Sequence, residues 1–212
     1  MRVLVACEYS GRVRDAFRKL GHDAMSCDLL PSDNDLPGCH YQGDVFNIIN
    51  DGWDLLIGHP PCTYLSNSGV CHLHKDASRW PKLFEGAAFF KRLLESNIPK
   101  IAIENPIMHG YAKTLIGGVK QTQIVHPWMF GHTEQKATCL WLKGLKTLTE
   151  SNNVKAEMLL LPKNERERLH YLPPSPDRWK IRSTTYQGIA NAMAEQWGGE
   201  CKWLINGENH ER

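Results

Sequence analysis

The sequence predicts an α/β protein that opens with a βαβ unit. Short β-branched apolar runs alternate with segments of helical periodicity, and an acidic residue or a cysteine follows several of the runs. The 212 residues fit one domain, or one domain with a small lobe. A mean hydropathy of −0.42 with 42% hydrophobic residues excludes a disordered or collagen-like chain.

The opening unit is predicted from residues 2–28. Residues 2–7 form an apolar run typical of a buried strand, and Gly11 stands in the turn that follows it. Residues 22–28 predict a second strand, which ends in a carboxylate. A helix is expected between them, because apolar residues recur there at helical spacing; they are Val13, Ala16, Phe17 and Leu20.

The rest of the chain continues the alternation of strands and helices. Asp44 is placed to cap a short helix. In chain order we expect a loop over 31–43, a short helix over 45–50, a strand over 53–57, a turn-rich segment over 63–79, a helix over 81–95, a strand over 100–103, strands over 123–130 and 137–142, irregular chain over 149–182 and a helix over 187–197.

Charge is unevenly distributed along a chain whose formal net charge is +2. Residues 1–60 carry five Lys/Arg and nine Asp/Glu, a net charge of −4. Residues 136–182 carry ten Lys/Arg and five Asp/Glu, a net charge of +5. Two interpretations of this basic segment stay open: a surface for a phosphate-bearing partner, and a solvated charged surface.

The cysteines indicate a reducing compartment. There are seven, irregularly spaced and without a C-x-x-C pair, so we expect free thiols and a cytoplasmic protein. No apolar run approaches the ~18 residues that would span a bilayer. The sequence Cys71-His-Leu-His74 is interpreted as a polar loop and not as a zinc clip, and no metal is expected.

Polar side chains follow the ends of the expected strands, where open α/β sheets bind ligands. Cys62 comes after two prolines, which stiffen the backbone and would hold a nucleophile in place. Glu104 ends an apolar run, where a carboxylate needs a partner or a ligand. Gly11 lets the backbone approach a ligand, and Asp28 lies where an acid holds ribose hydroxyls in nucleotide-binding folds. Structural alternatives are an inert thiol, a helix cap and a plain turn.

Taken in chain order, the motifs around these residues resemble those of the DNA (cytosine-5) methyltransferases, in particular short, divergent members from phages and prophages. Gly58-His-Pro-Pro-Cys62-Thr-Tyr-Leu-Ser66 resembles the catalytic loop, and Ile101-Ala-Ile-Glu104-Asn-Pro106 resembles the Glu-Asn strand end. Four shorter matches complete the series: Ser10-Gly11 with the AdoMet turn, Asp28 with the ribose-binding acid, Gly43-Asp44 with the acid that contacts the adenine, and Ile189-Ala-Asn191-Ala-Met193 with the motif that closes the cofactor pocket.

The resemblance runs from residue 3 to 197 and implies both fold and chemistry. The implied fold is an AdoMet-dependent methyltransferase (Rossmann-like) mixed sheet with helices on both faces and a very small or absent target-recognition domain. In the implied reaction, Cys62 adds to carbon-6 of cytosine, Glu104 hydrogen-bonds the base, and carbon-5 takes a methyl group from S-adenosyl-L-methionine (AdoMet).

The resemblance also implies binding residues and domain boundaries. The residues implied for AdoMet are Glu8, Tyr9, Ser10, Gly11, Asp28, Leu29, Asp44, Val45, Pro60 and Asn191. Those implied for substrate or DNA are Ser66, Lys136, Thr138, Arg178, Lys180 and Arg182, with Arg166 and Arg168 as further phosphate partners. The expected parts are a catalytic core over 1–142, a reduced recognition segment over 143–182, a C-terminal helix over 183–200 and a tail over 201–212.

Three departures from the family pattern keep other functions open. Val13-Arg14 replaces a glycine pair, Glu134-x-Lys136-x-Thr138 replaces Gln-x-Arg-x-Arg, and only about 45 residues separate Thr138 from Tyr186, where relatives hold a DNA-reading domain. Duplex DNA is the expected partner, with no obligate protein partner. The alternatives are a methylase of single-stranded nucleic acid, RNA or a free nucleotide, and a non-catalytic nucleic-acid-binding protein. A cysteine hydrolase is disfavoured, since we expect the His59 ring to point away from Cys62.

Overall fold

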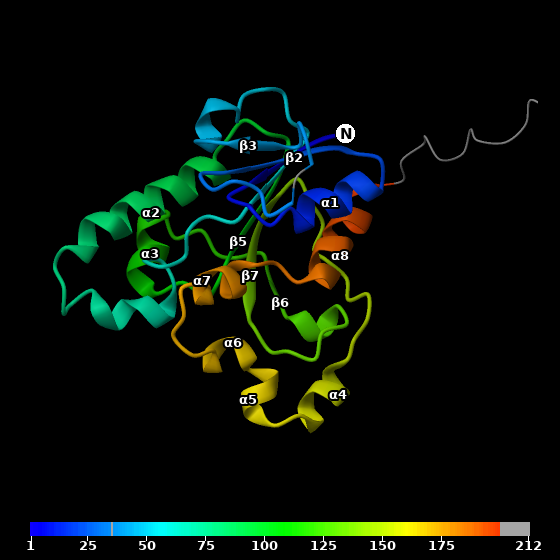
Figure 1. The fold of residues 1–212 in the computed structure, drawn as a ribbon. Helices are drawn as coiled ribbons and strands as arrows, with labels where there is room; N and C mark the ends of the chain where they lie inside the picture. Colours follow the sequence, from blue (N-terminus) through cyan, green and yellow to red (C-terminus); the bar gives the residue numbers. More distant parts are fainter. Residues whose placement is uncertain (35, 200–212) are drawn as a thin grey trace, which may run out of the picture.

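The computed structural model describes residues 1–34 and 36–199, and its centre is a seven-stranded sheet (Figure 1). The strands lie in the order β3-β2-β1-β4-β5-β7-β6. Strands β3 to β5 in that order are parallel, while β7 runs antiparallel to both of its neighbours. The bounds are β1 Arg2–Ala6, β2 Asp23–Asp28, β3 His40–Gln42, β4 Leu55–Gly58, β5 Lys100–Asn105, β6 Gln123–Val125 and β7 Thr138–Lys143.

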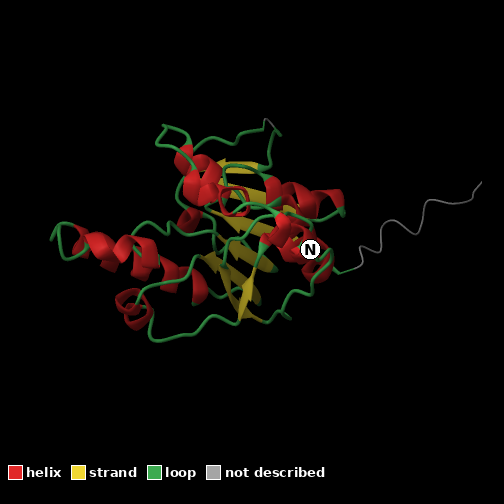
Figure 2. Cartoon of the chain, turned by 90° about the horizontal axis from the view of Figure 1, so that it is seen from below, coloured by secondary structure: helices red, strands yellow, loops and turns green. Residues whose placement is uncertain are grey.

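Helices cover both faces of this sheet, as Figures 1 and 2 show. Helices α1 and α8 lie on one side, and α2 and α3 lie on the other. The α-helices are α1 Arg12–Lys19, α2 Arg79–Leu94, α3 Gly110–Leu115, α4 Lys155–Leu160, α5 Lys163–Arg166, α6 Arg168–Tyr171, α7 Arg178–Ser183 and α8 Gln187–Gly198. Short 3-10 helices are η1 Val45–Asn47, η2 Asn67–His72 and η3 Pro127–Met129. The mixed sheet with helices on both faces confirms the expected fold class.

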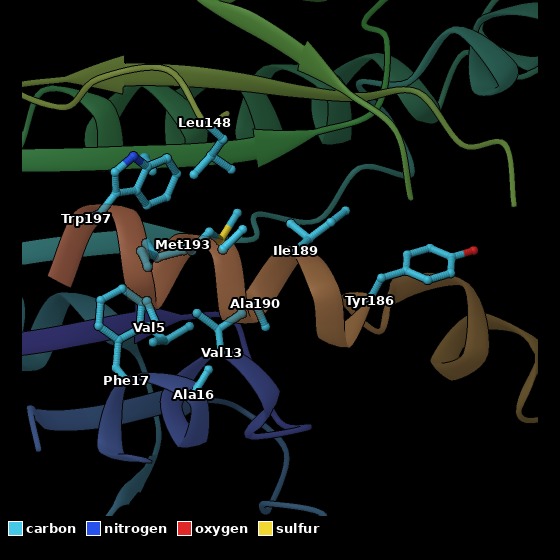
Figure 3. Packing of buried hydrophobic residues seen from close by; sticks show 14 of the residues in the cluster. Val5, Val13, Ala16, Phe17, Leu148, Tyr186, Ile189, Ala190, Met193 and Trp197 are labelled. Carbon is cyan, nitrogen blue, oxygen red and sulfur yellow. The ribbon is translucent and has the colours of Figure 1, made fainter. Parts of the chain in front are cut away.

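The alternation of side chains along the central strands explains the two layers. In β1, Val3 and Val5 belong to the apolar cluster under α1 and α8, while Leu4 belongs to the cluster under α2. Because all of these residues are buried, β1 is a central strand covered on both faces. Figure 3 shows the first cluster, to which α1 contributes Val13 and Phe17 and α8 contributes Met193 and Trp197.

The structure differs from the sequence prediction in its shortest elements. Strand β3 lies inside the expected loop over 31–43, and four short helices, α4 to α7, lie within the segment expected to be irregular. Elements of three to six residues are too short to show a periodic apolar pattern, so the sequence could not reveal them. The expected strand over 123–130 stops at Val125 and gives way to η3.

The cap predicted at Asp44 is confirmed. Asp44 caps η1, since its Oδ1 accepts a 2.9 Å hydrogen bond from the Phe46 amide. No described helix, over residues 1–34 and 36–199, combines the length and the apolar character that a membrane span requires. The expected tail over 201–212 and residue 200 of the expected C-terminal segment lie outside the described residues.

Candidate active site

The carboxyl ends of the parallel strands bring the predicted site residues to one edge of the sheet. Ala6 of β1 is in register with Gly58 of β4, which is in register with Ile103 of β5. Glu8 therefore comes two residues, and Glu104 one residue, after these aligned positions, and the loop to Cys62 leaves the sheet between them. The register accounts for why residues nearly a hundred positions apart share one site.

Backbone and side-chain hydrogen bonds fix the loop that carries Cys62. The His59 amide donates to the Ala6 carbonyl (2.9 Å), and the buried Asn105 side chain donates to the Pro60 carbonyl (3.3 Å). On the other side of the cysteine, the amide of the buried Ser66 donates to the Cys62 carbonyl (2.9 Å). The residues before Cys62 are thus tied to the sheet edge and those after it form a turn, while Cys62 itself is half-buried.

Two cationic residues from later in the chain act on the Cys62 thiol. Burial raises the pKa of Cys62 and Glu104 adds to the rise, whereas Lys136 and Arg182 oppose it. Lys136 Nζ also donates to the Arg182 carbonyl at 3.1 Å. The structure therefore brings together two predicted catalytic residues and two of the predicted substrate-binding residues.

Glu104 has a partner that the sequence reasoning missed. His59 Nδ1 lies 3.0 Å from Glu104 Oε2, and their side chains are 13% and 14% exposed. Burial alone would lower the pKa of His59, but the hydrogen bond and charge of Glu104, together with the charge of Glu8, raise it. For Glu104, burial favours the acid form, yet the His59 contact and the Lys136 charge lower its pKa. At neutral pH these opposite shifts favour an ion pair.

Sequence reasoning had expected the His59 ring to point away from Cys62 and gave it no role at this edge. The backbone of His59 continues the pairing of β4 with β1, and its ring meets the carboxylate at the end of β5. A usable signal was present: a histidine one residue after a buried strand, beside a strand that ends in a carboxylate.

The turn after β1 is built around a buried carboxylate. Glu8 accepts hydrogen bonds from the amides of Val13 (2.7 Å) and Arg14 (3.2 Å), so it caps the first turn of α1. Burial raises the pKa of Glu8, against the charge of His59 and these two amide bonds. Gly11 adopts φ 70°, where a side chain would be strained and would meet the Arg14 guanidinium.

Arg14 is one of the two residues that replace the glycine pair of the family pattern, and its contacts explain the replacement. The residue is fully buried, and its guanidinium donates to Ser26 Oγ (2.9 Å), to Ser32 Oγ (3.2 Å) and to the Asn34 side chain. It also pairs with Asp15 at 2.8 Å. The guanidinium therefore joins the turn, β2 and the following loop, in a space that glycine would leave open.

Asp28 and Asp44 stand together at the far end of this edge. Asp28 Oδ1 accepts from the Leu30 amide (3.0 Å), as Asp44 does from Phe46. Burial first, and then the charges of both aspartates, raise the pKa of Cys7. Cys7 has φ 60°, which makes it the one residue other than glycine with a positive φ in the described chain. The sequence did not single out this thiol.

Helix α7 lies across the turn at Tyr9. The buried Tyr9 hydroxyl donates to the Lys180 carbonyl (3.1 Å), and its ring centroid lies 5.7 Å from that of Trp179. Lys180 Nζ is 5.6 Å from the Tyr9 ring and 3.9 Å from an oxygen of Asp33. A residue implied for the cofactor and a residue implied for DNA are thus in direct contact.

The remaining predicted residues are less closely gathered. Asn191 is exposed on α8, and its amide oxygen accepts from Gln187. Thr138 is buried in β7, opposite Val125 of β6. The others are placed as follows: Ser10 half-buried beside the Arg12 amide, Leu29 exposed at 74%, Val45 and Pro60 buried, and Arg178 donating to the Leu172 carbonyl.

Comparison with known proteins gives similarity in fold. No family model and no curated protein sequence matches the chain. One similar solved structure is a prophage-encoded E. coli protein described as a DNA modification methyltransferase, with 19% identity over 77% of this chain and 56% of that one, and a TM-score of 0.44. The Entamoeba histolytica methyltransferase EhMeth has 13% identity, coverages of 84% and 64%, and a TM-score of 0.44. The S. pombe Dnmt2 methyltransferase has 13% identity, coverages of 85% and 62%, and a TM-score of 0.42.

The chain spans 56% to 64% of the length of these solved structures, all of which are described as methyltransferases. Within the described residues, the parallel strands with an antiparallel β7 form a mixed, Rossmann-like sheet.

Proposed function

We propose that this protein transfers a methyl group from AdoMet to carbon-5 of cytosine in DNA. The observation that carries the proposal is the meeting of Cys62, Glu104 and Lys136 at the carboxyl edge of the sheet. A thiol, a carboxylate and a cation at one point suit covalent activation of a heteroaromatic ring.

The proposed roles follow from what each side chain can do. Cytosine carbon-5 is too weak a nucleophile by itself, so the Cys62 thiolate uses a lone pair to bond carbon-6. The π pair of the C5=C6 bond then shifts into the ring and makes carbon-5 nucleophilic. Glu104 accepts a hydrogen bond from the exocyclic amine, next to ring nitrogen-3, where charge changes during the addition. Carbon-5 would then take the methyl group, whose bond to the donor sulfur breaks and leaves its electron pair on that sulfur. Carbon-5 loses its proton to a base, and the electron pair of that C–H bond re-forms the C5=C6 double bond as the Cys62 thiolate leaves.

AdoMet would supply an electrophilic methyl group on a sulfonium. The first turn and the ends of β2 and β3 fit such a cofactor. Gly11 lets the backbone turn at φ 70°. Asp28 and Asp44 each accept one backbone amide hydrogen bond at Oδ1. Carboxylates at these strand ends suit ribose hydroxyls and an adenine amine.

The basic residues of 136–182 are proposed to bind the nucleic-acid backbone. Lys136 and Arg182 are close enough to Cys62 to act on its thiol, so phosphates held there would lie near the reacting base. In duplex DNA the base would have to leave the stack. We place the activity in the cytoplasm of a bacterium or of a phage-infected bacterial host.

A second substrate class is favoured by one feature of this region. Glu134 is held by Tyr186 (2.8 Å) and Arg168 (3.0 Å), and Thr138 is buried. The segment that replaces Gln-x-Arg-x-Arg therefore offers Lys136 alone as a cation. A site with fewer cationic contacts suits a base that is already unstacked, in single-stranded nucleic acid or a free nucleotide.

The test combines a substrate panel with Cys62→Ser. Labelled AdoMet is incubated with duplex DNA, single-stranded DNA, RNA and dCMP, and the products are identified by mass spectrometry. We expect 5-methylcytosine in duplex DNA, complete loss of transfer in Cys62→Ser with AdoMet binding retained, and no loss in the matched control Cys71→Ser, whose thiol is exposed.

Trapping by 5-fluorocytosine gives an independent readout, because fluorine blocks the loss of a proton from carbon-5. A covalent complex through Cys62 is expected with active enzyme. Transfer by Cys62→Ser would disprove the nucleophile, product on another substrate alone would favour the second class, and a wild-type protein inactive on all four substrates would overturn the proposal.

A further inference from the structure

His59 is a largely buried imidazole that contacts one carboxylate and feels the charge of a second. Its Nδ1 lies 3.0 Å from Glu104 Oε2, and the charge of Glu8 also acts on it. Its Nε2 is buried and makes no hydrogen bond within the described residues. The cytosine chemistry proposed above assigns His59 no task, although it has the most direct contact with Glu104.

Charged groups face His59 from three elements. Glu8 comes from the turn after β1, Glu104 from β5, and Lys136 from the segment before β7. The two carboxylates favour the imidazolium, and Lys136 opposes it. Glu8 is itself fixed by two amides of α1, so the negative field on His59 comes from atoms that cannot easily move away.

The hydrogen bond constrains the geometry of Glu104. A carboxylate at the end of a strand can rotate about its side-chain torsions, and an unrestrained Glu104 would sample several orientations. Donation from Nδ1 to Oε2 fixes one oxygen and leaves Oε1 for a substrate group. Preorganisation of this kind lowers the barrier, because the group need not be ordered when the reaction begins.

We propose that His59 is the positioning residue for Glu104, holding Oε2 so that Oε1 can accept from the exocyclic amine of the base. This role rests on the proposed function. The charge of the imidazolium balances the carboxylate, so Glu104 stays ionised and serves as an acceptor. A base whose amine is replaced by a carbonyl, as in uracil, offers no matching donor, so the pair also favours cytosine over uracil.

Two substitutions separate the hydrogen bond from the charge. His59→Phe removes both, whereas His59→Asn keeps an N–H near the position of Nδ1 and never carries a charge. We expect His59→Phe to lower kcat by about tenfold or more, the typical cost of losing a partner that orients a reacting group. His59→Asn should recover most of that loss near neutral pH. His72→Asn, an exposed histidine on η2, is the matched control.

The pH profile supplies a readout that a purely structural role would not change. The ion pair exists above the lowered pKa of Glu104 and below the raised pKa of His59. Rising pH through the His59 pKa should therefore remove part of the wild-type kcat, and His59→Asn should lack that limb. An active wild type with an unaffected His59→Phe, or a His59→Asn profile that matches the wild type, would overturn the role.

A titration followed by NMR tests the contact without any activity. The His59 imidazole signals are assigned by their absence in His59→Asn, and their pKa is measured in the wild type and in Glu104→Gln. The pKa of His59 should fall in Glu104→Gln, because that variant lacks the carboxylate charge. An unchanged pKa would overturn the inference, whereas a wild-type protein that methylates none of the four substrates would overturn the proposed function and this role with it.

Discussion

Two regions approach Cys62 and are held in very different ways. The sheet edge at β1, β4 and β5 is fixed by strand pairing and by apolar clusters on both faces. The basic arm, residues 155–183 with helices α4 to α7, consists of helices of four to six residues. Leu169 of α6 joins the apolar cluster under α1 and α8, whereas the contacts of α7 include polar ones, from Tyr9 to the Lys180 carbonyl and from Lys136 to the Arg182 carbonyl. The difference separates groups that must be rigid for chemistry from groups that can adapt to a substrate.

The same substitution at matched leucines should show the largest contrast between the two regions. Leu56 of β4 is fully buried, while Leu160 of α4 is 86% exposed. Leu56→Ala removes packed methyl groups, so the free energy of unfolding should fall by about 2–5 kcal/mol. Leu160→Ala should change it by less than about 0.5 kcal/mol. Urea unfolding followed by circular dichroism measures both.

Equal losses of unfolding free energy in the two variants would contradict the view that packed residues of the edge contribute more to stability than exposed residues of the arm. The measurement also has an internal control. If the variants differ only in packing, the slope of unfolding free energy against urea concentration should be the same in both. A change in that dependence would indicate that the unfolded state, and not the core, had been altered.

Most of the edge could be predicted from the sequence because its signals are local. The buried strands carry runs such as Arg2–Ala6, and the residue that follows each run faces the same edge in any parallel sheet. Cys62 and Glu104 could therefore be placed in one site without knowing any distance. Asp44 could be assigned as a cap because a single residue and its next turn determine that contact.

What escaped prediction depends on contacts between distant segments. The contact of His59 is with Glu104, 45 positions later, and the aspartates that act on Cys7 are Asp28, at the end of β2, and Asp44, the cap of η1. The helices of the arm are too short to show a periodic pattern, so charge was the one feature visible there. The contact of Tyr9 with Lys180 joins residues 171 positions apart, which no single-sequence rule could reveal.

Lys136→Met tests whether the two regions are electrostatically coupled, because it removes a positive charge that acts on Cys62 at the sheet edge. The Lys136 cation lowers the pKa of Cys62, so its loss should raise that pKa and reduce the thiolate fraction at a given pH. Alkylation of Cys62 by iodoacetamide, followed peptide by peptide in a mass spectrometer, should become severalfold slower at pH 8. The matched control is Lys143→Met, whose ammonium binds the Ser96 carbonyl.

Arg182 has the smaller influence on the thiol, so Arg182→Met should slow the alkylation less than Lys136→Met does. An alkylation rate that stays constant in Lys136→Met, or that falls equally in the Lys143 control, would show that the basic segment does not act on the nucleophile. The two regions would then be electrostatically independent.

Tyr9→Phe tests the weakest link between the regions. The change removes one hydroxyl, which donates to the Lys180 carbonyl, and keeps the ring against Trp179. A single such hydrogen bond contributes about 0.5–1.5 kcal/mol, so the amides of α7 should exchange with deuterium about two- to tenfold faster while those of β4 stay protected. Tyr171→Phe, at an exposed ring on α6, is the control. Faster exchange in β4 as well would mean that the edge and the arm open together, and the arm would then be part of the rigid scaffold that holds Cys62.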